Sequence, residues 1–86
     1  MNKGTVVVSC TGHDKGTYYV LIYEKDGFLF LCDGKNKTLE KPKKKKLKHV
    51  KVTDCAIDLS GYSPLYDAHI LKELKSLLKK GGCCLG

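Results

Sequence analysis

The chain has 86 residues, of which 42% are hydrophobic, so it is long enough to form one small domain. A chain of this length buries only about 60–65% of its unfolded surface, which leaves little room for a deep catalytic pocket. The formal net charge is +7 at pH 7. This basic balance favours binding to nucleic acid or, less often, to an anionic membrane surface.

The first strand-like segment is the β-branched run at residues 5–10, and it leads into a loop flanked by two glycines. The loop reads Gly12-His13-Asp14-Lys15-Gly16. Glycine permits backbone conformations that other residues resist, and it allows a ligand to approach closely. Lys15 at the tip can place its positive charge next to a phosphate, and His13 is a candidate phosphate or base contact. Asp14 is expected to accept hydrogen bonds from turn amides. The alternative is an ordinary hairpin turn with a solvated lysine.

A second strand is predicted at residues 17–24, and its first tyrosines adjoin the loop. Successive side chains on a strand point to opposite faces, so one of Tyr18 and Tyr19 should pack and the other can stack on an unpaired base. The sequence leaves open which of them is exposed. Tyr18 is included among the candidate RNA contacts, although a core or rim position is the commoner role for a tyrosine on a strand.

A third strand is predicted at residues 28–32, after the pair Asp26-Gly27. This pair is a strong hairpin signal, because a type I′ turn needs positive φ at both central positions. The third strand is apolar on both faces, so we expect it to be central or covered by another element. Residues 38–40 can form a short strand before Pro42 interrupts pairing, and residues 47–53 alternate loosely and close the set.

The segment 41–51 contains seven of the 16 lysines and no acid, while the other nine lysines are balanced by nine carboxylates. The net charge is therefore local. Lysine is a point charge suited to phosphate, whereas arginine reads guanine edges, so we expect backbone contacts more than base reading. The alternative is a solvated charge run, but predicted strands tether this one at both ends, and Leu47 and Val50 are expected to anchor it. The candidate contacts are Lys41, Lys43, Lys44, Lys45, Lys46, Lys48 and Lys51, with His49 as either a further contact or a half-buried strand residue.

The last part of the chain has helical periodicity. Ser63 is a suitable N-cap and Pro64 suits a first helical turn. We predict a helix over about 63–80 that packs on a barrel formed by about residues 2–55, followed by a flexible tail at 81–86. A partner-binding helix is the alternative. The apolar stripe of this helix consists of Ile70, Leu71, Leu74, Leu77 and Leu78.

The five cysteines indicate neither a disulfide framework nor a zinc site, because their number is odd and no Cys-x-x-Cys pair occurs. Cys10, Cys32 and Cys55 lie among apolar residues and are expected to be small core residues. Cys83 and Cys84 fall in the predicted tail. We expect no metal, no cofactor, no signal peptide and no membrane span, and a reducing cytoplasm as the location.

The sequence from about residue 4 to residue 33 resembles a KOW motif. The features that carry the resemblance are Gly4-x-Val6-Val7, the 12–16 loop, Tyr19-Val20 and the extension through the lysine segment to residues 49–54. Together they are similar to small bacterial KOW-domain RNA-binding proteins, which are related to large-subunit ribosomal proteins of the eukaryotic and archaeal type. The resemblance implies an SH3-like barrel, binding to ribosomal RNA, and contacts with ribosomal or transcription proteins.

Enzymatic chemistry has little support in this sequence, because no serine or cysteine nucleophile is placed with His13-Asp14 in a recognised spacing. We therefore expect residues 1–86 to be a single, mainly β domain, monomeric and non-catalytic, that binds RNA in the cytoplasm and takes no small-molecule substrate. The alternative is a protein-interaction module of the transcription or translation machinery. Attachment to an anionic membrane is less favoured, because no amphipathic helix with bulky aromatic residues adjoins the lysine segment.

Overall fold

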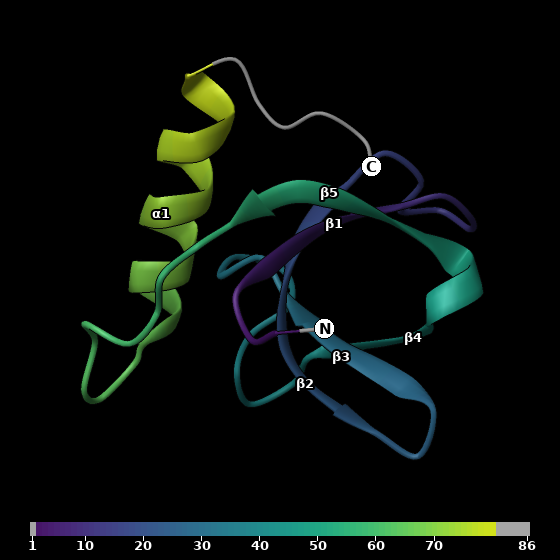
Figure 1. Cartoon of the computed structure of the whole chain (residues 1–86), viewed down its shortest axis with the longest axis horizontal. Helices are drawn as coiled ribbons and strands as arrows, with labels where there is room; N and C mark the ends of the chain where they lie inside the picture. The colour runs from purple at the N-terminus through teal and green to yellow at the C-terminus, as the bar shows by residue number, and fades with distance from the viewer. Residues whose placement is uncertain (1, 81–86) are drawn as a thin grey trace.

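The computed structural model describes residues 2–80 and has a sheet of five antiparallel strands beside one helix (Figure 1). The strand order in the sheet is β4-β3-β2-β1-β5. In chain order the elements are β1 (Thr5–Ser9), β2 (Tyr18–Lys25), β3 (Phe28–Cys32), β4 (Lys43–Lys46), the 3-10 helix η1 (Leu47–His49), β5 (Val50–Ala56) and α1 (Asp67–Lys79).

The sheet curls into a small SH3-like barrel. β4 and β5 stand at opposite ends of the strand order, yet only η1 separates them along the chain. The four residue steps from Lys46 at the end of β4 to Val50 at the start of β5 span about 8 Å, because a 3-10 helix rises about 2 Å per residue. The two ends of the sheet must therefore curve toward each other, as Figure 1 shows for β5 and β4. The predicted fold class, a mainly β barrel with a C-terminal helix, is confirmed.

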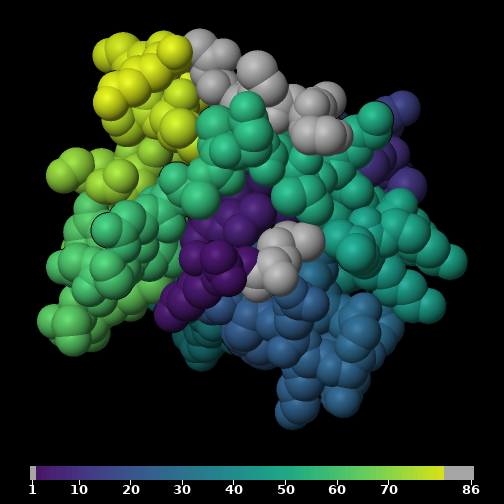
Figure 2. Space-filling model, in the orientation of Figure 1, coloured from purple at the N-terminus to yellow at the C-terminus, as the bar shows by residue number. Residues whose placement is uncertain are grey.

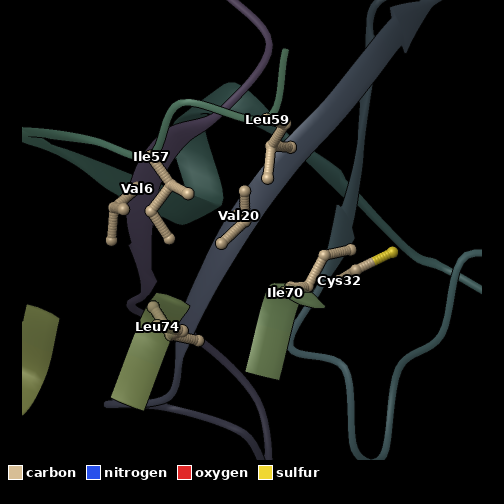
Figure 3. Packing of buried hydrophobic residues seen from close by; sticks show 7 residues of the cluster. All are labelled: Val6, Val20, Cys32, Ile57, Leu59, Ile70 and Leu74. Atoms are coloured by element: carbon tan, nitrogen blue, oxygen red, sulfur yellow. The ribbon is translucent and has the colours of Figure 1, made fainter. Parts of the chain in front are cut away.

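Neighbouring residues on the central strands point to opposite sides of the sheet and form two apolar clusters. One cluster fills the barrel and consists of Val7, Tyr19, Leu21, Leu29, Leu31 and Val50. The other lies between the sheet and α1, where Ile70 and Leu74 of the helix lie opposite sheet residues (Figure 3). Its members are Val6, Val20, Cys32, Ile57, Leu59, Ile70 and Leu74. The helix therefore packs on the barrel, as predicted.

The helix begins later than the sequence suggests. It starts at Asp67, and Ser63 and Pro64 lie in the irregular connection before it. The backbone N–H of Tyr66 donates to His69 Nδ1 at 3.1 Å, so Tyr66 takes the capping position predicted for Ser63. The connection is needed for packing, because Leu59 and Leu65 both contact the cluster under the helix. The proposed tail at 81–86, with Cys83 and Cys84, lies outside the described residues.

The lysine segment also folds differently from the prediction. No strand forms at residues 38–40, because the carboxylate of Asp67 accepts the N–H of Leu39 at 2.7 Å and ties this stretch to the helix start. Instead, Lys43–Lys46 is itself the strand β4 and pairs with Phe28–Leu31 of β3. Tertiary pairing overrides the low strand preference of lysine here.

The expected hairpin turn forms, and one of the three expected core cysteines, Cys32, is buried. Asp26 and Gly27 have φ values of 53° and 80°, as a type I′ turn requires. Cys32 is fully buried, and burial raises the pKa of its thiol to about 12, which makes it an inert core residue. Cys10 and Cys55 are both half-buried, and Cys55 packs against the cluster under the helix.

Candidate nucleic-acid interface

The 12–16 loop is a tight turn between β1 and β2, closed by backbone hydrogen bonds. Gly12 and Gly16 have φ values of 80° and 90°, in the region that glycine adopts without steric penalty. The N–H of Gly16 donates to the carbonyl of Ser9 at 2.8 Å. His13 and Lys15 are exposed. The loop therefore presents a lysine charge on a fixed backbone, as predicted.

Asp14 has a different role from the predicted one. Its carboxylate accepts hydrogen bonds from Ser9 Oγ at 3.0 Å and from the hydroxyl of Tyr19 at 2.9 Å, and it pairs with Lys45 Nζ at 3.0 Å. These partners are side chains, whereas the sequence suggested turn amides. Asp14 thus fastens the loop to β1, β2 and β4 at once, and its side chain is only 18% exposed.

Lys45 belongs to the interior, not to the charged surface. The residue is 8% exposed, and its ammonium donates to Ser9 Oγ at 2.6 Å and to the carbonyl of Thr11 at 2.8 Å. Its charge is neutralised by Asp14. Strand alternation explains the difference, because Lys45 points inward while Lys44 and Lys46 point outward. Lys45 and Asp14 are therefore removed from the set of direct phosphate contacts.

The Asp14 carboxyl gives a test of this network by acid unfolding. Partial burial raises its pKa, but hydrogen bonds from Lys45, Tyr19 and Ser9 outweigh this effect and lower the pKa from 3.8 to about 2. A carboxyl with a lowered folded-state pKa stabilises the fold above pH 3.8, and this contribution is lost as the pH falls toward 2. We expect Asp14→Asn to lose less stability than the wild type between pH 5 and pH 2, measured by urea unfolding. Glu40→Gln, at an exposed position, is the control and should follow the wild type; equal acid sensitivity of Asp14→Asn and the wild type would contradict the network.

The outward lysines of β4 lie beside aromatic rings. Phe28 pairs with Lys46 and Phe30 with Lys44 in the β3–β4 register, so each pair shares one face of the sheet. Lys44 Nζ lies 4.3 Å and Lys46 Nζ 5.7 Å from the centre of the Phe28 ring. Across the neighbouring strand pair, Phe30 of β3 is paired with Tyr23 of β2. The two rings are stacked, with their centres 4.5 Å apart.

We call this surface the aromatic–lysine face; it consists of Tyr23, Lys25, Phe28, Phe30, Lys44 and Lys46. In Figure 2 the surface of the β2–β3 hairpin (blue) adjoins that of the β4–η1 segment (teal). The sequence indicated that β3 is apolar on both faces and needs a cover. The helix covers this face of β3 only near Cys32. Near Phe28 and Phe30 the face is flanked by the outward lysines of β4 and by Tyr23 of β2. The sequence signal for this face is the alternation that puts Phe28 and Phe30 on the same side of β3. The lysines that share this face can be identified only when the pairing of β3 with β4 is known.

The remaining predicted contacts are distributed around this region. Lys41, Lys48 and Lys51 are exposed and His49 is half-buried. Lys43 is 34% exposed and lies 3.9 Å from the Asp14 carboxylate. Tyr19 is buried, while Tyr18 is half-buried and packs against the cluster under the helix. Val50 is buried and anchors the segment as predicted, but Leu47 is 53% exposed and does not.

The fold brings the 12–16 loop and the lysine segment together. The N–H of Cys10 donates to the carbonyl of His49 at 2.9 Å, and Ser9 pairs with Val50 in the β1–β5 register. Lys45 reaches across from β4 to Thr11, just before the loop. Two regions separated by more than twenty residues in the sequence therefore lie side by side in the fold.

No family model matches the chain, and no curated protein is found to be similar to it. The resemblance to KOW-motif proteins stays a prediction from the sequence. Within residues 2–80, no helix is long and apolar enough to cross a membrane, and no group of three or more His, Cys, Asp or Glu side chains is arranged to hold a metal ion.

Proposed function

We propose that this protein is a non-catalytic cytoplasmic RNA-binding protein that contacts structured RNA, with ribosomal RNA as the candidate class. The observation that carries the proposal is the adjacency of the 12–16 loop and the lysine segment on one small barrel. Phosphate is the anion that such a surface suits, because lysine binds it as a point charge. The resemblance to KOW-motif proteins supports the choice of ribosomal RNA.

The structure reduces the number of charges available to the ligand. Lys45 is neutralised in the interior and Lys43 lies near Asp14. The exposed lysines of this region are Lys15, Lys41, Lys44, Lys46, Lys48 and Lys51. They point in several directions, so we expect about four to contact one RNA at a time. Four neutralised phosphates correspond to a slope of about −3 to −4 for log K against log salt concentration.

The test is a charge-removal variant with a matched control on the helix. We expect the quadruple change Lys44→Gln, Lys46→Gln, Lys48→Gln and Lys51→Gln to weaken binding to a structured ribosomal RNA fragment about 30- to 100-fold. The salt slope should shrink in magnitude by about 3 for the same reason. The control replaces four exposed lysines at the other side of the fold, Lys72, Lys75, Lys79 and Lys80, by glutamine.

The control variant loses the same net charge, so it should weaken binding less than threefold if the site is local. Lys15→Glu should separately weaken binding about tenfold, because it reverses the charge at the tip of the loop. Equal losses in the two quadruple variants would contradict a defined interface. Unchanged RNA affinity in the quadruple variant of the lysine segment, with an intact fold, would refute this interface. No measurable RNA affinity in the wild type would refute RNA binding and favour the protein-interaction alternative, which a nuclease-resistant, salt-resistant pull-down would then show.

A further inference from the structure

The stacked pair Tyr23–Phe30 lies at the surface of the β2–β3 hairpin. The two rings are nearly parallel, with an interplanar angle of 9°, and Tyr23 is 46% exposed. One face of the Tyr23 ring is occupied by Phe30. The exposed part of the Tyr23 ring offers a flat surface of the kind on which a second ring can stack.

The architecture keeps this pair uncovered. β1 pairs with β2 only as far as Val20, and the β2–β3 register shifts between Leu21 and Tyr23. The hairpin therefore extends past β1, and the helix packs at the opposite end of the same face, near Cys32. Tyr23 lies on this extension, held by pairing with β3.

Three lysines lie beside the aromatic rings. Lys25 is paired with Phe28 and is exposed, while Lys44 and Lys46 hold their ammonium groups over the Phe28 ring. A cation–π contact of this kind is weak at an exposed site, so a phosphate can displace it without large loss. Flat rings next to exposed cations complement a chain in which flat bases alternate with phosphates.

We propose that the aromatic–lysine face binds unpaired nucleotides of single-stranded RNA, with a base stacked on Tyr23 and phosphates on Lys25, Lys44 and Lys46. This inference rests on the proposed RNA-binding function and adds the kind of RNA that this face takes. An A-form duplex keeps its bases stacked inside, so it cannot offer a base to Tyr23. The face therefore discriminates between single strands and duplexes, which lysine contacts alone would not do.

Stacking on Tyr23 can be followed directly, because the chain contains no tryptophan. In the Tyr23→Trp variant we expect saturable quenching of tryptophan fluorescence by a 12-nucleotide oligoadenylate RNA and little change with a 12-base-pair RNA duplex. Tyr66→Trp is the matched control, because Tyr66 is also an exposed tyrosine but lies at the start of the helix. Quenching of both variants alike, or of neither, would overturn the inference.

Affinity gives the second measurement. Tyr23→Leu should weaken binding of the oligoadenylate about 5- to 100-fold, the range for loss of one base–aromatic stack, and should change duplex affinity less than twofold. Tyr23→Phe keeps the ring and should retain most of the affinity. Circular dichroism and the melting temperature establish that each variant is folded.

The outcomes separate this inference from the proposed function. If Tyr23→Leu binds single strands as the wild type does, or loses affinity for single strands and duplexes equally, the stacking site is refuted. The loss of RNA affinity in the lysine variant would then still support the proposed function, and the aromatic pair would serve another ligand such as a peptide. If the lysine variant also binds RNA as the wild type does, the interface proposed for the lysine segment fails together with the stacking site.

Discussion

Replacing Lys45 with methionine is expected to destabilise the protein by about 2–4 kcal/mol while leaving its RNA affinity within about twofold of the wild type. The change removes the cation that pairs with Asp14 at 3.0 Å and the donor to Ser9 and Thr11. Removing one partner of a buried ion pair leaves an uncompensated charge, which costs about 3–5 kcal/mol when burial is complete. The Asp14 side chain retains 18% exposure, so we expect a somewhat smaller loss.

The matched control for Lys45→Met is the same substitution one residue earlier. Lys44 is exposed on the opposite side of β4, so Lys44→Met should change stability by less than about 1 kcal/mol and weaken RNA binding about three- to fivefold. Urea unfolding and RNA titration measure the two effects. Combining Lys45→Met with Asp14→Asn should recover about 1–2 kcal/mol relative to additive losses. Equal behaviour of the two lysine variants would contradict the assignment of inner and outer lysines.

Replacing Gly34 with alanine is the second change with a large expected effect, a loss of about 3–4 kcal/mol of unfolding free energy. Gly34 has φ of 80°, and a Cβ atom there would lie 2.6 Å from the backbone nitrogen of Leu71 in α1. The turn cannot easily move away, because the Asp33 carboxylate accepts the backbone N–H groups of Lys35, Asn36 and Lys37, each at 2.9 Å. The helix must therefore shift and weaken its packing on the sheet.

Gly27→Ala separates this steric effect from backbone strain. Gly27 also has φ of 80°, but no atom of residues 2–80, apart from Gly27 and its two chain neighbours, lies within 4 Å of the position that a Cβ would take. Its substitution should cost only the strain of a left-handed residue, about 1–2 kcal/mol. The difference between the two variants, measured by urea unfolding, reports the contact between the turn and the helix. If both alanine variants lose the same amount, that contact contributes nothing.

The elements that could be predicted from the sequence are those whose signals are local. The β-branched run at 5–10 and the Asp26-Gly27 turn are determined by preferences of a few adjacent residues. The start of the helix was misplaced, because Ser63-Pro64 has good local start chemistry but the packing of Leu59 and Leu65 delays the helix to Asp67. β4 was not predicted, because four successive lysines carry no strand signal of their own and the strand depends on pairing with β3.

The candidate site was predictable to a similar extent. The 12–16 loop and the lysine segment were recognisable as charge and glycine patterns. The inward position of Lys45 was not, because it depends on which residues of β4 face the barrel. The stacking of Tyr23 on Phe30 required the register across the β2–β3 hairpin, including its irregularity after Leu21. Residue types and spacing identified the basic region. Which of its lysines are buried and which are exposed depends on long-range strand pairing.

The lysines of β4 have a further consequence for the behaviour of the protein at high concentration. β4 is an edge strand of the sheet, and within residues 2–80 it pairs only with β3. A strand with one unpaired side is a template for sheet formation between molecules, and natural proteins discourage this with charged side chains, lysine above all. The exposed charges of Lys44 and Lys46 thus repel a second copy of the chain at this strand edge, where aggregation would most readily begin.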